Sequence, residues 1–349
     1  MTRASAALGA EYPAEVEYRL VGRTGLRVSL LGLGCAGFGG VGSEVALFGG
    51  GEDEEAAFAI MDRAFELGIN HFDTANSYGG GRSEEMVGRW LGSRGVRQEI
   101  VLATKVATRL GPGVNDGGLS RRHILQQVEA SLRRLGTDWL DVYITHQVDP
   151  ETAPEETLRA LDDLVRSGKV RYVGAANIEG WRLMKQLWTS DRLGLARVEL
   201  VQNEYNLLRR TAEAQVLPVA EDQTLAIVAY SPLAGGWLTG KYRRGEPAPS
   251  GSRMTTRAGP YRHLQKERTF DALDALAAEA AERGVSMGAL ALAWVTSHPS
   301  VSSALVGPRR PDQFDAAVES LGLALTAQDR QRLVERMDAA PADVCSPQR

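Results

Sequence analysis

The sequence predicts an α/β protein of the (β/α)8 TIM-barrel class, with an N-terminal β-hairpin and an extra C-terminal helix. Eight short apolar runs alternate with stretches of helical periodicity along the chain. The runs are apolar almost without interruption, which is typical of parallel strands buried on both faces. No GxGxxG motif opens the first helix, which argues against a Rossmann sheet. A closed barrel therefore explains the pattern better than an open doubly wound sheet.

The domain organisation follows from the length and from the limits of the pattern. The chain has 349 residues, a length that one large barrel can reach. We expect a single barrel over residues 17–340. A flexible N-terminal tail is expected at residues 1–16, and a short C-terminal tail at residues 341–349.

The composition limits which partners and which cellular compartment are expected. The formal net charge is −4 and no long basic run is present, so neither nucleic acid nor an anionic membrane surface is an expected partner. The start lacks the apolar core of a signal peptide, and no apolar run approaches the roughly 20 residues that span a bilayer. Cys35 and Cys345 have neither disulfide-framework nor zinc-site spacing, which favours a reducing compartment and predicts a cytoplasmic location.

The first elements are a hairpin and a glycine-rich segment. Tyr18–Val21 and Arg27–Leu30 are expected to pair around a turn at Gly22–Gly25. Leu31–Gly34 follows as the first buried strand. Gly37–Gly51 is expected to be a mobile loop on the active face.

Helix signals follow each of the next strands. Ser83 and Ser120 are expected N-caps, because a serine hydroxyl accepts a hydrogen bond from an N–H of the first turn. Pro154 suits the first position of a helix. In this half we expect strands at Ile69–Phe72, Val101–Lys105 and Leu140–His146, and a first helix that begins near Asp53.

The second half continues the alternation. Pro232–Glu267 is a long loop rich in glycine, proline and arginine, and loops of this length are usually functional. Strands are expected at Val170–Gly174, Val198–Gln202, Leu225–Tyr230 and Ser302–Val306. Helices are expected at Gly180–Trp188, Thr211–Ala220, Phe270–Arg283 and Ser286–Ser297, with Pro311 opening the last barrel helix and Gln328–Met337 forming the extra helix.

Three successive strands end in ionisable residues. Asp73, Lys105 and His146 stand at these ends, and Tyr78 lies on the loop after the first of them. Taken singly, the four suit a helix cap, a surface charge, a core histidine and a loop aromatic. In a βα barrel, however, the carboxyl ends of all the strands meet at one face, where catalytic residues gather. The set as a whole therefore predicts an active site.

These residue types suit acid–base chemistry on a carbonyl. Tyrosine has a pKa of about 10, and a neighbouring ammonium such as that of Lys105 is expected to lower it. Asp73 can pair with Lys105, and His146 can donate a hydrogen bond to a carbonyl oxygen. The set forms a general acid for a developing alkoxide. It contains no reductant, so the hydride is expected to come from a cofactor.

Several motifs carry a family resemblance. Phe72–Ala75 with Tyr78–Gly79, Ala103–Lys105, Ala229–Leu233 and Leu305–Gly307 resemble the aldo-keto reductase family, as does the strand ending in His146. The likeness runs from Tyr18 to about Leu321. It implies a (β/α)8 barrel that binds NADP(H) without a Rossmann fold. It also implies Tyr78 as the proton donor, supported by Lys105, Asp73 and His146.

The same resemblance implies a set of cofactor contacts. Asn177 and Gln202 match residues that hold the nicotinamide carboxamide, and Tyr230 matches the aromatic residue that stacks on the nicotinamide ring. The pyrophosphate loop corresponds to Ser231, Pro232, Leu233, Ala234 and Gly235, with Lys241 as a basic residue beyond it. The adenosine 2′-phosphate segment corresponds to Gly307, Arg309 and Gln313.

Some positions depart from the family pattern or lie outside it. Ala176 replaces a common serine, Cys35-Ala36 replaces Thr-Trp or Thr-Met, and Ala316-Ala317 replaces Glu-Asn near the adenine. In the long loop, Lys241 or Arg253 is predicted to reach across the bound pyrophosphate. The histidines form no metal-spaced cluster, so no metal is predicted.

The prediction is an NADP(H)-dependent oxidoreductase that reduces an aldehyde, ketone or sugar-type carbonyl. Asn115–His123 resembles family branches that act on deoxysugar nucleotides and small aldehydes, so the substrate could be a sugar or sugar nucleotide. Trp237 and Phe38 could line its pocket or pack as ordinary loop residues. One alternative is a sugar 1-dehydrogenase working oxidatively. Another is a non-catalytic nucleotide-sensing subunit like the potassium-channel β subunits, which resemble the family with asparagine at the His146 position; this histidine favours an enzyme.

Overall fold

The computed structural model describes residues 16–339 and shows a closed eight-stranded parallel barrel. The strands follow one another around the barrel in the order β10-β3-β4-β5-β6-β7-β8-β9, and an antiparallel hairpin of β1 and β2 lies outside it. The predicted fold class is confirmed. The predicted tails at 1–16 and 341–349 fall almost entirely outside the described residues, and the assignment of 17–340 to one domain stays a prediction.

The strands are short, as the apolar runs predict. In chain order they are β1 Tyr18–Leu20, β2 Arg27–Ser29, β3 Leu31–Gly34, β4 His71–Asp73, β5 Val101–Val106, β6 Leu140–Thr145, β7 Val170–Ala176, β8 Val198–Glu204, β9 Ala226–Tyr230 and β10 Val301–Val306. The β5 strand is buried along its whole length, which explains its continuous apolar character.

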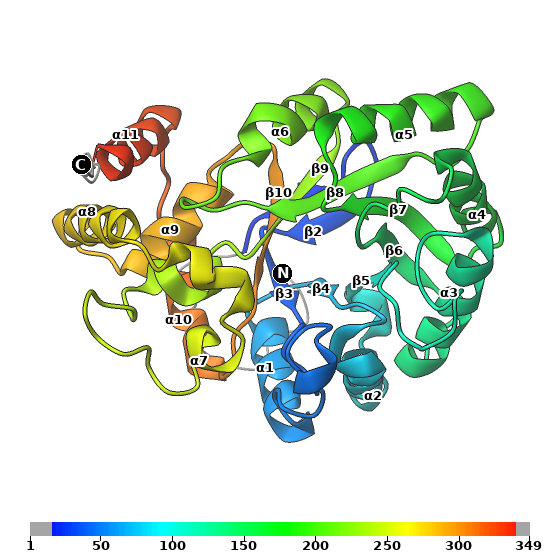
Figure 1. Ribbon diagram of the computed structural model, residues 1–349, viewed down its shortest axis with the longest axis horizontal. Coiled ribbons are helices and arrows are strands. Elements are labelled where there is room, and N and C mark those ends of the chain that lie inside the picture. The colour runs from blue at the N-terminus through cyan, green and yellow to red at the C-terminus, as the bar shows by residue number, and fades with distance from the viewer. Residues whose placement is uncertain (1–15, 340–349) are drawn as a thin grey trace, which may run out of the picture.

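The helices surround the barrel (Figure 1). The α-helices are α1 Glu54–Glu66, α2 Arg82–Arg94, α3 Arg121–Leu135, α4 Pro154–Arg166, α5 Gly180–Leu193, α6 Ala212–Asp222, α7 Arg253–Thr256, α8 Glu267–Arg283, α9 Met287–Thr296, α10 Asp315–Leu321 and α11 Ala327–Asp338. The short 3-10 turns are η1 Val45–Leu47, η2 Tyr78–Gly81, η3 Arg97–Glu99, η4 Ala234–Thr239, η5 Gly259–Leu264 and η6 Pro311–Phe314. The extra C-terminal helix α11 packs against α8 at the edge of the molecule (Figure 1).

The hairpin closes one end of the barrel interior. Val21 and Val28 are fully buried and pack with side chains of the strands, among them Val101, Leu200 and Val228. This contact fills the end at which the strands begin. The carboxyl ends of the strands are left to form the functional face.

Two of the predicted caps have different outcomes. Ser120 caps α3, because its hydroxyl accepts the N–H of His123. Ser83 does not cap α2, which begins one residue earlier, after Gly81 in a left-handed conformation with φ of 100°. The Ser83 hydroxyl is fully buried and donates instead to the carbonyl oxygen of Cys35, at 2.8 Å. It ties the loop after β3 to the helix.

The two long loops are more structured than expected. Pro232–Glu267 was expected to lack secondary structure, which is wrong: it contains η4, α7 and η5. These segments are too short to produce a helical period in the sequence. Gly37–Gly51 contains η1 and lies on the functional face as expected, and its mobility stays a prediction. No helix within residues 16–339 combines the length and apolar character needed to cross a bilayer.

Candidate active site

Neighbouring strands bring the four predicted catalytic residues together. Asp73 is the last residue of β4 and pairs in register with Ala103 of β5. Lys105 lies two residues further along β5, beside Ile144 of β6. His146 directly follows β6, and Tyr78 opens η2 on the loop after β4. The barrel geometry alone therefore sets these side chains on one face.

Lys105 is the buried centre of this group. Its ammonium donates to Asp73 Oδ1, to the carbonyl oxygen of Thr74 at 2.8 Å, and to the Tyr78 hydroxyl at 3.4 Å. The side chain is fully buried, and the Asp73 carboxylate beside it is almost fully buried. A buried ammonium is tolerated only when it is paired and hydrogen-bonded, and both conditions hold here.

The other carboxylate oxygen of Asp73 is also occupied. Gln202 Nε2, on β8, donates to Asp73 Oδ2 at 2.8 Å across the barrel. Asp73 is thus fixed from two sides, by Lys105 and by Gln202. Gln202 also lines the cavity described below, so this one residue contacts both the Asp73 carboxylate and the cavity.

Tyr78 is a protonated phenol at neutral pH. Burial raises its pKa above the ordinary value of 10.0, and Lys105 lowers it by a smaller amount. Lys105 does lower the pKa of Tyr78, as its positive charge predicts. The expectation of a net lowered pKa is wrong, because the effect of desolvation is larger than that of the ammonium. The hydroxyl group therefore keeps its proton at neutral pH and can act as an acid.

His146 is held in its neutral form. Burial lowers its pKa to about 3, and the positive charge of Lys105 adds to this effect. Its ring lies at a centroid distance of 5.6 Å from the Tyr78 ring, with the planes 80° apart. Its Nδ1 is buried and has no hydrogen-bond partner within residues 16–339. A neutral imidazole keeps one N–H donor, which suits a carbonyl oxygen.

A cavity of about 1480 Å³ begins at Tyr78 and His146 and extends to the segment before α10. It exceeds the roughly 300–1,000 Å³ of sites for drug-sized molecules, so it can take a long ligand. Lys105 and Ala234 are the two predicted site residues outside its lining; Ala234 is buried beneath the loop. The predicted residues that line it are Asp73, Tyr78, His146, Asn177, Gln202, Tyr230, Ser231, Pro232, Leu233, Gly235, Lys241, Arg253, Gly307, Arg309 and Gln313.

Asn177 and Tyr230 join the acid–base group to this cavity. The Tyr230 hydroxyl donates to Asn177 Oδ1 at 2.7 Å, and Asn177 Nδ2 donates to the carbonyl oxygen of His146 at 2.8 Å. Asn177 adopts a left-handed backbone conformation with φ of 52°. The chain of contacts places the Tyr230 ring on the wall of the cavity and links it to the backbone of His146.

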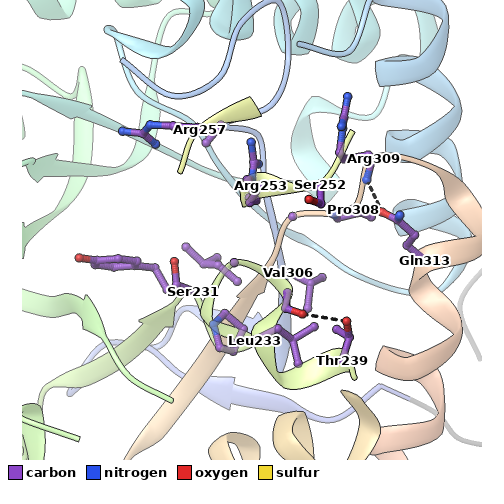
Figure 2. A pocket seen from close by; sticks show the side chains of 18 of the residues that line it. Ser231, Leu233, Thr239, Ser252, Arg253, Arg257, Val306, Pro308, Arg309 and Gln313 are labelled. Carbon is purple, nitrogen blue, oxygen red and sulfur yellow. Dashed lines mark hydrogen bonds between the residues drawn. The ribbon is translucent and has the colours of Figure 1, made fainter. Parts of the chain in front are cut away.

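Cationic side chains gather at the far end of the cavity (Figure 2). Arg309 Nε pairs with the buried carboxylate of Glu52 at 2.5 Å, and the Arg309 N–H donates to Gln313 Oε1 at 2.7 Å. Among the described residues, Lys241 and Arg253 have no side-chain hydrogen bond or ion pair. Burial lowers the pKa of Lys241, and the neighbouring Arg253 and Arg309 lower it further. Like charges are thus held together, which favours an anionic ligand.

The loop after β9 is shaped for close approach. Ser231 and Ala234 have left-handed φ values of 51° and 49°, and Gly235 and Gly236 follow at 64° and 91°. A Cβ on Gly235 would lie 2.6 Å from the Tyr261 ring, so glycine is required there. Nearby, the buried Ser252 hydroxyl lines the cavity without a partner within residues 16–339. Free donors and cations along a long cavity fit a phosphate-bearing dinucleotide.

Sequence comparison identifies the family. The model of the aldo/keto reductase family matches residues 30–337, which is most of the chain. The chain belongs to the aldo/keto reductase family. These proteins are oxidoreductases that act on carbonyl compounds. The recognition made from the motifs is confirmed.

Individual relatives have several functions. The chain is 39% identical over 322 residues to an uncharacterized oxidoreductase, YrpG, of Bacillus subtilis, covering 89% of this chain and 92% of the relative. It is 35% identical over 319 residues to the L-glyceraldehyde 3-phosphate reductase of Escherichia coli K12, covering 88% of each. It is also 34% identical over 312 residues to a probable voltage-gated potassium channel subunit beta of Arabidopsis thaliana, covering 88% and 91%.

Two aromatic residues proposed for the substrate pocket of this aldo/keto reductase lie elsewhere. Trp237 is 2% exposed and packs at centroid distances of 4.7 Å on Tyr242 and 5.7 Å on Phe270. Phe38 is 1% exposed. Neither lines the cavity, so ordinary packing is the correct interpretation. Within the described residues, no group of three His, Cys, Asp or Glu side chains could hold a metal ion.

Sequence reasoning missed several polar residues of the site. Among them, Glu52, Ser252 and Arg257 line the cavity but had no assigned role. Each lies in or beside a glycine-rich or proline-rich loop, where no hydrophobic period marks the position. Glu52 directly precedes Asp53, the N-cap of α1, but this position alone does not indicate that its side chain lines a cavity.

Proposed function

We propose that the protein is an NADP(H)-dependent aldo/keto reductase that reduces an aldehyde, ketone or sugar-type carbonyl, with Tyr78 as the general acid. One observation carries this proposal. A protonated phenol opens onto the cavity while Lys105 and Asp73, buried behind it, contact it by one chain of hydrogen bonds. A structural ion pair has no need of a phenol on its solvent side.

The proton passes from Tyr78 to the substrate, and the other three residues support this transfer. Tyr78 donates its hydroxyl proton to the carbonyl oxygen as negative charge develops there. The Lys105 ammonium, 3.4 Å from the same hydroxyl, stabilises the phenolate that forms. Asp73 holds Lys105 in place. The neutral His146 donates a hydrogen bond to the substrate oxygen and fixes its position.

The cofactor supplies the hydride when it is bound. Tyr230, Asn177 and Gln202 would hold its nicotinamide end, next to the catalytic group. The loop from Ser231 to Gly235 with Lys241 and Arg253 would hold the pyrophosphate, since cations and free backbone groups gather there. Gly307, Arg309 and Gln313 would hold the adenosine 2′-phosphate, where a guanidinium suits a dianion.

A panel of aldehydes, ketones and sugars with NADPH tests the proposal directly. The expected result is a fall in NADPH absorbance that requires both the protein and a carbonyl compound, and that is slower with NADH. A protein that binds NADPH but consumes it with no member of the panel would contradict the catalytic part of the proposal. The same assay with alcohols and NADP⁺ tests the oxidative sugar 1-dehydrogenase alternative.

A nucleotide-sensing subunit is the second candidate, because a potassium-channel β subunit is among the relatives. His146 favours the enzyme, since those subunits resemble the family with asparagine there. The variant His146→Asn separates the two. An enzyme should lose most of its turnover while keeping its affinity for NADPH. A cytoplasmic location and a sugar or sugar-nucleotide substrate stay predictions.

A further inference from the structure

Arg257 stands apart from the phosphate-binding cations. It follows α7 directly and lines the same cavity as Arg253 and Arg309. In Figure 2 its side chain points away from both of these arginines. Its guanidinium therefore serves a different part of the cavity from the end that suits the pyrophosphate and the 2′-phosphate.

The loop below Arg257 leads to the proton donor. A Cβ on Gly42 would lie 2.7 Å from Arg257 Nη1, so the guanidinium rests on the Gly42 backbone. The carbonyl oxygen of Gly42 accepts the N–H of Gly79 at 3.0 Å, and Gly79 follows Tyr78 in the chain. Arg257 also lowers the pKa of Tyr78 slightly, as a nearby positive charge must. The guanidinium thus lies over the catalytic end.

Most of the N–H donors of the Arg257 guanidinium have no hydrogen-bond partner among the described residues. Nε donates to Glu44 Oε2 at 3.3 Å, and this pair is open to solvent, with exposed fractions of 33% for Arg257 and 51% for Glu44. Within residues 16–339, Nη1 and Nη2 have no hydrogen-bond partner. An exposed pair of this kind contributes little energy. Glu44 therefore occupies only one of the guanidinium nitrogens and leaves Nη1 and Nη2 available to a ligand in the cavity.

We propose that Arg257 binds an anionic oxyacid group, a carboxylate or a phosphate, on the carbonyl substrate, so that acidic carbonyl compounds are preferred over neutral ones of the same shape. This inference rests on the proposed reduction of carbonyls. A planar fork of N–H donors matches the paired oxygens of either group and can bind them bidentately. The anion would hold the carbonyl at a fixed distance from Tyr78.

Matched substrate pairs test this preference. Succinic semialdehyde is compared with its methyl ester for a carboxylate, and glyceraldehyde phosphate with glyceraldehyde for a phosphate. With the wild-type protein, kcat/KM should be higher for the charged member of at least one pair. In Arg257→Ala that advantage should fall by about tenfold to one hundredfold, mainly through KM, as expected for hydrogen bonds to a charged group. Neutral members should change by less than about threefold.

Two further variants sharpen the test. Arg257→Lys keeps the charge but loses the fork, so it should restore only part of the advantage. Arg262→Ala removes the same charge from an exposed position of the same loop that does not line the cavity, and it should leave the preference unchanged. Equal losses for charged and neutral substrates in Arg257→Ala would overturn the inference. So would a matching loss of NADPH affinity, which would place Arg257 on the cofactor.

A binding measurement separates this inference from the proposed function. Succinate is titrated calorimetrically into the protein saturated with NADP⁺, which requires no turnover. Binding to the wild type but not to Arg257→Ala supports the anion site even if none of the aldehydes is reduced, a result that would count against catalysis alone. No difference in succinate binding between the two proteins overturns the anion site, even when reduction of neutral aldehydes is observed.

Discussion

The ammonium nitrogen of Lys105 lies 3.4 Å from the hydroxyl oxygen of Tyr78 while it also holds the carboxylate of Asp73. One buried cation therefore links a phenol that faces the cavity to a carboxylate that also accepts a hydrogen bond from Gln202. The position of the phenol is thus set from behind, by residues of β4 and β5. Any ligand meets a group whose geometry is already fixed.

Tyr78→Phe should abolish carbonyl reduction. The variant keeps the ring and its packing but removes the only proposed proton donor, and loss of a positioned acid costs about 10²-fold or more in rate. Cofactor affinity should stay nearly intact, because other loops supply the phosphate contacts. Steady-state kinetics and NADPH fluorescence titration measure the two quantities, and a variant with near-full activity would show the assignment to be wrong.

The rate of reduction should be independent of pH across the neutral range. Reduction needs protonated Tyr78, and the raised pKa keeps it protonated past its ordinary value of 10.0. It also needs neutral His146, whose pKa of about 3 lies far below this range. The rate should fall only as the pH rises through the pKa of Tyr78. A reduction rate that already halves between pH 6 and pH 8, well below the raised pKa of Tyr78, contradicts this assignment.

Lys105→Met should destabilise the fold strongly. It leaves the Asp73 carboxylate buried without its cation, and breaking a buried pair from one side costs about 3–5 kcal/mol in the free energy of unfolding. The double variant with Asp73→Asn removes the stranded charge as well. It should recover part of the loss, which urea denaturation can measure. A single variant as stable as the wild type would argue against the buried pair.

Arg309→Ala should reduce the preference for NADPH over NADH. The guanidinium lies at the end of the cavity proposed for the 2′-phosphate, which NADH lacks. We expect NADPH to bind about tenfold or more weakly, or about 1.4 kcal/mol, with little change for NADH. Arg310→Ala is the matched control, since Arg310 is exposed and already paired with Asp312 at 3.0 Å. Equal effects on both cofactors would place Arg309 elsewhere.

The loop between Gly235 and Arg257 should become ordered when NADP⁺ binds. Lys241 and Arg253 lie on this loop without side-chain hydrogen bonds or ion pairs among the described residues, so a bound phosphate would give them one. Local ordering appears as protection of backbone amides in hydrogen exchange. The strand β5, Val101–Val106, is buried throughout; it is the internal reference and should not change. Unchanged exchange in both segments would rule out closure over the cofactor.

The sequence was sufficient to predict the barrel and the face at which Asp73, Lys105 and His146 meet. Each strand is a short buried run, and a run that ends in Asp73, Lys105 or His146 carries that side chain to the same face in any βα barrel. These features depend on local pattern and on one topology, both of which can be inferred from a single chain.

Other features depend on packing that the sequence does not reveal. The net pKa shift of Tyr78 follows from how deeply the phenol is buried, and this is set by loops from distant parts of the chain. Glu52 and Arg257 reach the cavity because separate loops fold over one another. Ser83 turned out to bridge two segments instead of capping α2. Each outcome is decided by tertiary contacts, which have no local signature.

The two halves of the chain contribute different parts of the candidate site. The acid–base group comes from the ends of β4, β5 and β6, whereas most of the cavity proposed for the cofactor is built after β7 to β10. The hydrogen bonds from Gln202 to Asp73 and from Asn177 to His146 join the two halves. If the proposed function holds, mutations in the later half should change the choice of nucleotide more than they change the acid–base group. Chimeric proteins that exchange these halves between relatives are therefore feasible to design, provided that both hydrogen bonds are kept.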